Sequence, residues 1–287
     1  MHGNTKYTPY AIDILLLNYN NMNNDELSLL LGISKSKVRY LMDKLKLKRT
    51  NHISCPPYKK RNSNTCKHIT PLLEDSLTVF YWIGFILADG WIRKASSGRH
   101  MYYQLGVELS MKDYTHLCKL ANFLGVKCTT STRNTNFKSN YDMCRVGVTN
   151  FPTIPKIMEK FDIKFNKTTN PPNPHNYNFT DEQLLAMFIG FIDGDGSISR
   201  RVKKTTEQTI LSIQNRAEWF EWLEFMLCLV KRNFDTDSKV KVRMNSRNHA
   251  YLCLTKHNVL LQIKDFAVSN SLPILERKWD AIVAYTH

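Results

Sequence analysis

Apolar residues recur at helical spacing three times between Pro9 and Arg49. The periodic positions are Ile12, Leu15, Leu16, Leu27, Leu30, Leu31, Val38, Leu41, Met42 and Leu45. Residues three or four apart lie on one face of a helix, so the pattern predicts three short amphipathic helices. Gly32 supplies a tight turn before the third helix, where the Ser34 hydroxyl can accept a hydrogen bond from a free backbone N–H. We expect a small all-α domain with a helix-turn-helix pattern at residues 1–50.

The third predicted helix, KSKVRYLMDKL, has a basic outer face. If Val38, Leu41 and Leu45 pack inward, the side chains that point outward include Lys35, Ser36, Lys37, Arg39, Tyr40 and Lys44. Such a face can reach phosphates and base edges in a major groove. The alternative is a helical module whose basic face is only solvated. The coincidence of turn, cap and basic face on one helix favours DNA binding.

Residues 51–74 show no hydrophobic periodicity and are expected to form a basic linker that can follow a phosphate backbone. Its basic cluster is Lys59, Lys60 and Arg61. The segment also holds four residues that can bind zinc, namely His52, Cys55, Cys66 and His68. Their spacing matches none of the usual zinc-finger patterns, so a solvated linker with reduced thiols is the preferred interpretation.

From about residue 71 the pattern of elements occurs twice. Each copy begins with an apolar helix that ends on Asp-Gly, as WIGFILADG at 82–90 and as FIGFIDGDG at 188–196. Alternating stretches, a second helix, two further strands and a closing helix follow in each copy. Thr180 and Gln183 are spaced as a capping box that opens the second apolar helix. The predicted fold is α+β, with two pseudo-symmetric αββαββα repeats at residues 75–175 and 176–287.

The strands are expected to have one core face and one polar face, because side chains alternate with period two. YYQLGVELS buries Tyr103, Leu105, Val107 and Leu109, and SKVKVRM buries Val240, Val242 and Met244. Polar residues on or near the other face are Arg93, Lys94, Tyr102, Gln104, Arg145, Ser199, Arg201, Lys203, Ser212, Lys239, Lys241 and Arg243. Arg and Lys can reach guanine edges in a groove and Gln can reach adenine. An antiparallel sheet ordinarily exposes one polar face to water, but a face of that kind would mix acids and bases more evenly.

The two apolar helices carry small residues four positions apart, Gly84 with Ala88 and Gly190 with Gly194, which permit close backbone contact. If the helices pair in parallel, Asp89 and Asp195 meet where the chain turns at Gly90 and Gly196. Two carboxylates at helix C-terminal ends repel each other and the helix dipole, so a cation should lie between them. Oxygen ligands beside a phosphate-binding surface favour Mg²⁺, with Mn²⁺ as an alternative. The candidate metal-site residues are Asp89, Gly90, Asp195 and Gly196.

Composition supports a polyanionic partner, because the 287 residues include 40 Lys+Arg against 25 Asp+Glu and carry a net charge of +15. The apolar run at residues 79–88 is too short to span a bilayer, and we expect neither membrane contact nor an export signal. Seven cysteines, an odd number, do not indicate a disulfide framework. A reducing compartment is expected, either the cytoplasm or an organellar matrix.

WIGFILADG and FIGFIDGDG resemble the two signature helices of LAGLIDADG homing endonucleases in the single-chain, two-repeat form, over roughly residues 75–287. The resemblance implies a saddle of two antiparallel sheets over DNA and divalent-metal-dependent cleavage of both strands. The family's metal-binding acid corresponds to Asp89 and Asp195, while the earlier acid of the motif is Asp193 in the second copy and Leu87 in the first. The resemblance also implies a polar residue after the second strand of each repeat and a lysine near the last helix. The matching positions are Gln214 or Asn215, Glu108 or Met111, and Lys164, Lys167 and Lys278, of which Gln214, Lys167 and Lys278 are the catalytic candidates beside the two acids.

Three functions compete for this sequence. The first is a site-specific endonuclease whose N-terminal helices add DNA contacts, the second is a DNA-binding regulator without cleavage, and the third is a maturase that uses the fold on intron RNA. Both terminal aspartates favour the first, because a pure binder has no use for paired acids facing phosphate. We expect double-stranded DNA as the partner, with intron RNA as the alternative, and a monomer without an obligate protein partner.

Overall fold

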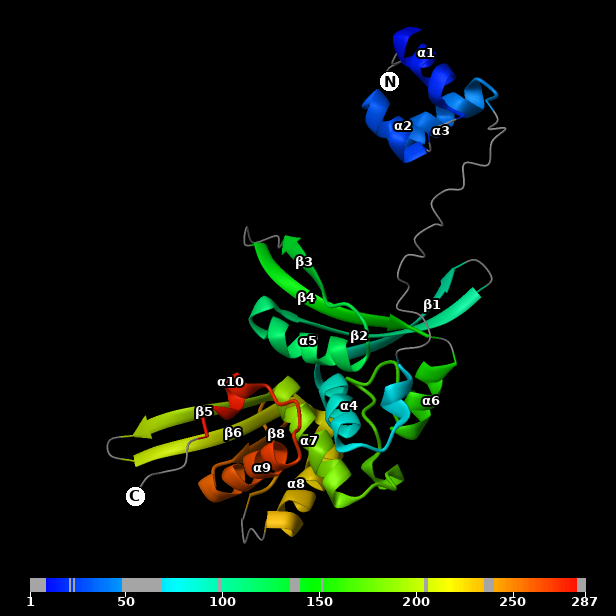
Figure 1. The fold of residues 1–287 in the computed structure, drawn as a ribbon. Coiled ribbons are helices and arrows are strands. Elements are labelled where there is room, and N and C mark those ends of the chain that lie inside the picture. The colour runs from blue at the N-terminus through cyan, green and yellow to red at the C-terminus, as the bar shows by residue number, and fades with distance from the viewer. Residues whose placement is uncertain are drawn as a thin grey trace. The chain divides into compact units, whose positions relative to one another are not determined.

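The computed structural model describes residues 9–20, 22, 24–47, 69–97, 100–134, 140–150, 152–203, 206–234 and 240–282. The chain divides into two compact units, residues 1–63 and 64–287 (Figure 1). Across the described ranges, no helix has the length and apolar character that crossing a membrane would require.

The described part of the first unit contains the three helices that the periodicity predicts. They are α1 (Pro9–Asn18), α2 (Asn24–Leu31) and α3 (Lys35–Lys44). Their small core consists of Leu15, Leu27, Val38, Leu41 and Met42. Gly32 has a φ of +61° in the turn before α3, and the Ser34 hydroxyl accepts a hydrogen bond from the Lys37 N–H at 3.4 Å. The periodic positions Leu16 and Leu30 do not join this core, because they are 44% and 49% exposed.

The second unit contains the predicted order of helices and strands twice, which confirms the αββαββα pattern. The first copy consists of η1 (Thr70–Leu73), α4 (Leu77–Asp89), β1 (Gly90–Ser97), β2 (His100–Ser110), η2 (Met111–Asp113), α5 (Tyr114–Phe123), β3 (Thr129–Asn134), β4 (Asn140–Thr149) and α6 (Thr153–Lys160). The second consists of η3 (Pro174–Asn176), α7 (Asp181–Asp195), β5 (Gly196–Lys203), β6 (Thr206–Arg216), η4 (Ala217–Trp219), α8 (Phe220–Phe234), β7 (Arg243–Met244), β8 (His249–Leu254), α9 (His257–Ser269) and α10 (Glu276–Trp279).

Each copy forms an antiparallel four-stranded sheet with the same connection, in the order β1-β2-β4-β3 and β5-β6-β8-β7. The equivalent register is visible at the first strands, where Gly90 pairs with Val107 and Gly196 pairs with Ile213. Helices cover one face of each sheet, while α4 and α7 lie where the two copies meet (Figure 1). One continuous hydrophobic core joins residues from both copies.

The predicted seam between the two apolar helices is present. A Cβ built on Gly84 would lie 1.8 Å from the carbonyl oxygen of Met187, and one on Gly190 would lie 1.9 Å from that of Tyr81. Nearer the helix ends, a Cβ on Gly194 would lie 2.2 Å from the Cβ of Ala88. Gly84 also lies close to Phe191, and Gly190 to Phe85, so each glycine fits between two residues of the other helix. These contacts are followed by that of Ala88 with Gly194, so α4 and α7 run parallel and their C-terminal ends adjoin. The capping box formed by Thr180 and Gln183 opens α7, as predicted.

Gly90 and Gly196, where the chain turns after these helices, do not have the left-handed conformation that glycine commonly adopts at a helix end. Their φ angles are −79° and −78°, in the extended region open to any residue. A Cβ on Gly90 would lie 2.5 Å from the carbonyl oxygen of Ile86, and one on Gly196 would lie 2.6 Å from that of Ile192. Glycine is therefore needed at both places because the strand leaves tightly against the last turn of the helix.

The strand predicted over residues 238–244 is described from Val240 onward. Within residues 240–244, only Arg243 and Met244 pair with β8, as β7, and Met244 is 44% exposed instead of buried. Val242 is buried as predicted, and Val240 packs partly against the core. Strand β7 lies at the edge of its sheet, where the alternating pattern has a neighbour on one side only.

Candidate functional site

The two predicted acids lie together at the adjoining ends of α4 and α7. Asp89 and Asp195 are the last residues of these helices, and both are half-buried. The carboxylate of Asp89 faces Gly194, since a Cβ built there would lie 3.4 Å from Asp89 Oδ2. Burial and the charge of Asp195 raise the pKa of Asp89 to about 6, against the opposing charges of Lys278 and Lys167. The site thus concentrates negative charge that a bound cation would stabilise.

Asn215, and not Gln214, is the amide that contacts an acid. Burial raises the pKa of Asp195, while Lys167, Lys278 and a hydrogen bond from Asn215 act in the opposite direction. Asn215 Nδ2 donates to Asp195 Oδ2 at 2.8 Å. Gln214 is exposed and shares the outer face of β6 with Ser212, so of the two predicted positions Asn215 is the one that contacts Asp195. Strand alternation contains the missing signal, because Asn215 shares the inner face with buried Ile213.

Each helix end also receives one of the predicted lysines. Lys167 Nζ donates to the carbonyl oxygens of Leu87 at 2.6 Å and Ala88 at 2.8 Å. Lys278 Nζ donates to the carbonyl oxygens of Ile192 at 3.1 Å, Gly194 at 3.0 Å and Gly196 at 2.7 Å, and also contacts that of Asp193.

These lysines place positive charge where a helix C-terminus carries partial negative charge. Burial lowers the pKa of Lys167, and the charges of Asp195 and Asp89 oppose that shift. Burial also lowers the pKa of Lys278, opposed by Asp193 and Asp89. Each lysine is therefore linked both to a helix end and to the paired acids.

The donor set fits a divalent cation of the magnesium type. Among the described residues, no group of three or more His, Cys, Asp or Glu side chains could hold a metal ion. Mg²⁺ commonly uses one or two protein carboxylates and completes its shell with waters and phosphate oxygens, which is what Asp89 and Asp195 offer. The Gly196 carbonyl, predicted beside the metal, accepts its hydrogen bond from Lys278.

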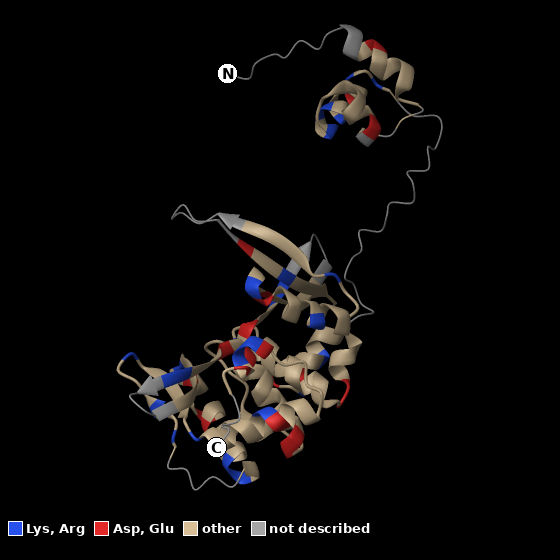
Figure 2. Cartoon of the chain, turned by 60° about the vertical axis from the view of Figure 1, so that its left-hand side comes forward, with Lys and Arg blue, Asp and Glu red and all other residues tan. Residues whose placement is uncertain are grey.

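A cavity of about 400 Å³ lies beside Asp89 and Lys278. Its wall includes Glu108, Asp113 and Arg277, where both carboxylate oxygens of Asp113 accept hydrogen bonds from the Arg277 guanidinium at 2.5 and 2.8 Å. Figure 2 shows acidic and basic residues side by side in this central region of the second unit. The cavity therefore gives room beside Asp89 for a ligand with charged groups.

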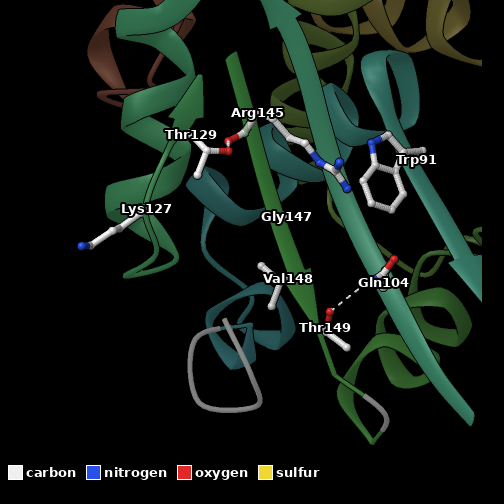
Figure 3. Close-up of a pocket in the computed structure, with 8 residues that line it drawn as sticks. All are labelled: Trp91, Gln104, Lys127, Thr129, Arg145, Gly147, Val148 and Thr149. Atoms are coloured by element: carbon white, nitrogen blue, oxygen red, sulfur yellow. Dashed lines mark hydrogen bonds between the residues drawn. The ribbon is translucent and has the colours of Figure 1, made fainter. Parts of the chain in front are cut away.

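The outer face of the β1–β4 sheet carries an aromatic and cationic cluster around Trp91. The guanidinium carbons of Arg93 and Arg145 each lie 4.8 Å from the centre of the Trp91 ring. Gln104 accepts a hydrogen bond from Arg93 Nε at 2.5 Å and donates to Thr149 Oγ1 at 3.2 Å. Figure 3 shows Arg145 pointing toward Trp91 beside a hollow of about 220 Å³, which is lined by Trp91, Gln104, Lys127, Thr129, Arg145, Gly147, Val148 and Thr149.

This hollow exists because two glycines face each other in the middle of the sheet. Gly106 pairs with Trp91 on one side and with Gly147 on the other. A Cβ on Gly106 would lie 2.4 Å from Trp91 Cζ2, so the indole occupies the space that a side chain would fill. Sequence reasoning missed Trp91, although its position two residues before Arg93 placed it on the same face.

The remaining predicted DNA contacts fall into several groups. Tyr102 shares the outer face with Gln104, whereas Lys94 lies on the opposite face of β1 from Arg93. Ser199, Arg201 and Arg243 are exposed on the outer face of the β5–β8 sheet, Ser212 is half-buried there, and Lys241 is exposed before β7. On α3, the predicted contacts Lys35, Ser36, Lys37, Arg39 and Tyr40 are all exposed. Lys59, Lys60, Arg61, Lys239, His52, Cys55, Cys66, His68 and the side chain of Lys203 lie outside the described residues.

The two sheets present different chemistry at equivalent positions. Ser197 in β5 occupies the place of Trp91, and Tyr251 in β8 occupies the place of Arg145. The aromatic and cationic cluster of the first copy is thus replaced by hydroxyl groups in the second. A ligand that spans both sheets would meet two unlike surfaces.

No protein-family model matches the sequence. Among solved structures, the chain is similar to I-SmaMI bound to an uncleaved DNA target in the presence of calcium ions, with a TM-score of 0.47 and 15% identity, covering 69% of this chain and 86% of that one. It is also similar to the LAGLIDADG homing endonuclease I-GzeII in complex with its DNA target, with a TM-score of 0.46 and 14% identity, covering 70% and 88%. A further similar structure is the LAGLIDADG homing endonuclease I-SmaMI bound to cleaved DNA, with a TM-score of 0.46 and 14% identity, covering 70% and 85%.

Proposed function

We propose that the protein is a site-specific DNA endonuclease of the LAGLIDADG type that hydrolyses phosphodiesters with Mg²⁺ or Mn²⁺. One observation carries the proposal: Asp89 and Asp195, from two copies of one motif, end parallel helices that adjoin in close backbone contact. Such a pair of carboxylates is costly unless a cation lies between them, and Mg²⁺ held by carboxylates commonly takes phosphate oxygens as further ligands. Its retention in both copies favours cleavage over binding alone.

The contacts of the site residues give each of them a separate proposed role. Asp89 and Asp195 would hold the divalent ion, which when bound activates water and stabilises charge on the leaving oxygen. Lys167 and Lys278 bring positive charge to the same helix ends, where a scissile phosphate would lie. Asn215 orients the carboxylate of Asp195 through its hydrogen bond.

The proposed DNA contacts come from the outer faces of the two sheets and from α3. On the first sheet, stacking on Trp91 orients the Arg145 guanidinium, which can then donate to guanine O6 and N7. On the second sheet, exposed Arg201 and Arg243 supply positive charge. Exposed Lys35, Lys37 and Arg39 on α3 would add phosphate contacts and lengthen the footprint.

The test begins with selection of duplexes that the full chain binds from a randomised DNA library in EDTA. The selected sequence is then placed in a supercoiled plasmid, and Mg²⁺ is expected to cause nicking followed by linearisation. Asp89→Asn and Asp195→Asn should each keep binding but lose cleavage by more than the roughly 10- to 100-fold that loss of a residue supporting a metal ligand costs.

The matched control for these variants is Asp265→Asn, which removes an exposed carboxylate from α9 and should cleave like the wild type. Cleavage at the wild-type rate by both Asn variants would contradict the proposed roles of the acids. Tight binding without cleavage in Mg²⁺ or Mn²⁺ would instead assign the chain to the DNA-binding regulators.

A further inference from the structure

Asp193 is a buried acid that the proposed chemistry does not use. Only 1% of its surface is exposed, and its carboxylate accepts hydrogen bonds from three groups outside its own helix. Tyr81 Oη of α4 donates at 2.6 Å, the Leu275 backbone N–H at 2.8 Å and Trp279 Nε1 at 2.6 Å. A buried carboxylate is costly unless it is fully hydrogen-bonded, so these contacts need an explanation.

Two of the three donors lie on the segment that carries Lys278. Leu275 and Trp279 lie on either side of this lysine in the sequence. Between them, Arg277 forms the bidentate ion pair with Asp113 of the first copy. Lys278 Nζ then reaches the carbonyl oxygens at the end of α7. The backbone around Lys278 is therefore tied on both sides, and its side chain is directed toward the two metal-binding acids.

The first copy holds its lysine with different chemistry. Leu87 occupies the position of Asp193 and is also buried, with 1% of its surface exposed. The backbone next to Lys167 is held instead by a hydrogen bond from Trp219 Nε1 of the second copy to the Thr168 carbonyl oxygen at 3.2 Å. Because leucine fills the equivalent position, packing at this point of the motif helix does not by itself require an acid.

We propose that Asp193 is a positioning residue that fixes Lys278 against the end of α7, and that it makes the two lysines of the site inequivalent. The inference rests on the proposed function, in which both lysines stand beside the scissile phosphates. Hydrogen bonds to a charged acceptor are about twice as strong as neutral ones, so the carboxylate holds the segment firmly. A displacement of about 1 Å in a reacting group can cost roughly 100-fold in rate. Cleavage of one DNA strand therefore depends on Asp193, and cleavage of the other does not.

Trp279→Phe removes one donor to Asp193 while keeping an aromatic ring in place. Trp222→Phe is the matched control, because Trp222 is equally buried and donates its indole N–H to Tyr177 Oη instead of to Asp193. The first measurement is the rate at which acetic anhydride acylates Lys278 and Lys167, read by peptide mass spectrometry without DNA or metal. We expect Trp279→Phe to accelerate acylation of Lys278 severalfold and to leave Lys167 unchanged, whereas Trp222→Phe changes neither.

The second measurement is nicking of each strand of an end-labelled target duplex in Mg²⁺. Lys278→Met identifies the DNA strand whose cleavage depends on this lysine. Trp279→Phe should slow cleavage of the same strand by roughly 10- to 100-fold, while cleavage of the other strand stays near the wild-type rate. In the Lys278→Met background, Trp279→Phe should add nothing further. A general loss of folding would instead slow both strands together.

Equal slowing of both strands, or unchanged acylation of Lys278, would overturn the positioning role. If Trp279→Phe does not fold, Asp193→Asn replaces it, since the amide keeps an acceptor for Trp279 but opposes the Leu275 N–H with a donor. If the wild-type chain cleaves no DNA, the proposed function fails, and the acylation rates alone decide whether Asp193 holds Lys278.

Discussion

Gly84 of α4 and Met187 of α7 lie in backbone contact, so close that a Cβ on the glycine would be 1.8 Å from the Met187 carbonyl oxygen. A backbone atom cannot rotate away as a side chain can. Overpacking of a core costs roughly 1–3 kcal/mol, and we expect Gly84→Ala to lower the free energy of unfolding by about 3 kcal/mol. Separation of the helices should also reduce metal-dependent cleavage, because Asp89 and Asp195 are carried on their ends.

Urea denaturation of the full chain checks the stability, and the Mg²⁺ dependence of nicking checks the site. Gly147→Ala is the control, since a Cβ there would meet its nearest atom, Arg145 Nε, at 3.7 Å. That change should alter stability by less than about 0.5 kcal/mol. An equal loss of stability in the two variants would show that the seam does not account for the effect.

The seam is a part of the structure that the sequence predicts well. Small residues four apart in two similar helices indicated close contact, and the paired ends followed for Asp89 and Asp195. The side chains that form hydrogen bonds with the acids were harder to predict from the sequence. The sequence left Gln214 and Asn215 as alternatives, and the alternation of faces along β6 distinguishes them, because Asn215 and not Gln214 lies on the face that contacts Asp195. The partners of Asp193 come from Tyr81 and from the segment of Lys278, and no local pattern relates residues so distant in sequence.

Asn215 distinguishes the second acid from the first, because its amide donates to Asp195 at 2.8 Å while the equivalent position of β2 is Leu109. Asn215→Leu should leave Asp195 less well oriented toward a cation. Supports of metal ligands contribute roughly 10- to 100-fold to metal affinity or activity, so the Mg²⁺ concentration for half-maximal cleavage should rise within that range. Gln214→Leu, one residue earlier on the outer face, should leave the Mg²⁺ requirement unchanged. If Gln214→Leu raised the required Mg²⁺ concentration and Asn215→Leu did not, Gln214 and not Asn215 would be the residue that supports the acid.

Arg145 is predicted to read one base pair because stacking on Trp91 fixes its guanidinium. Arg145→Ala should cost about 1–3 kcal/mol of binding at a single position of the target and relax specificity there. Binding to a set of duplexes with every single substitution gives the affected position. Lys94→Ala is the control, because Lys94 lies on the other face of β1. A loss spread evenly over the target would identify Arg145 as a phosphate contact instead.

His116 is a buried ring that should make the second unit sensitive to acid. Burial and the charge of Lys119 lower the pKa of His116 from its ordinary value of 6.5 to about 4, against the charges of Glu276 and Asp113. Between these two pH values the unfolded chain binds the proton and the folded chain does not. Stability is therefore complete above pH 6.5 and falls as the pH decreases toward 4.

The loss attributable to this one group should reach about 2 kcal/mol at pH 5. His116→Gln cannot titrate but keeps a donor for Tyr81 Oη, which His116 Nε2 approaches at 3.2 Å. Urea denaturation at pH 8 and pH 5 should show a smaller decrease for the variant than for the wild type. Equal decreases in the free energy of unfolding would mean that the folded protein binds the proton at His116 as readily as the unfolded chain does.

The basic face of α3 is predicted to bind phosphates, because Lys35, Lys37 and Arg39 are exposed on the helix that follows the Gly32 turn. Replacement of all three by alanine removes up to three ionic contacts from the complex. The slope of log affinity against log salt should then decrease in magnitude by about 2.7, since each phosphate contact contributes roughly 0.9. Deletion of residues 1–50 should shorten the footprint in the same region. Because Asp89 and Asp195 lie in the second unit, both changes should leave Mg²⁺-dependent nicking intact at low salt. An unchanged salt slope would mean that this face is only solvated, and a loss of nicking at low salt would give the helical unit a part in the chemistry itself.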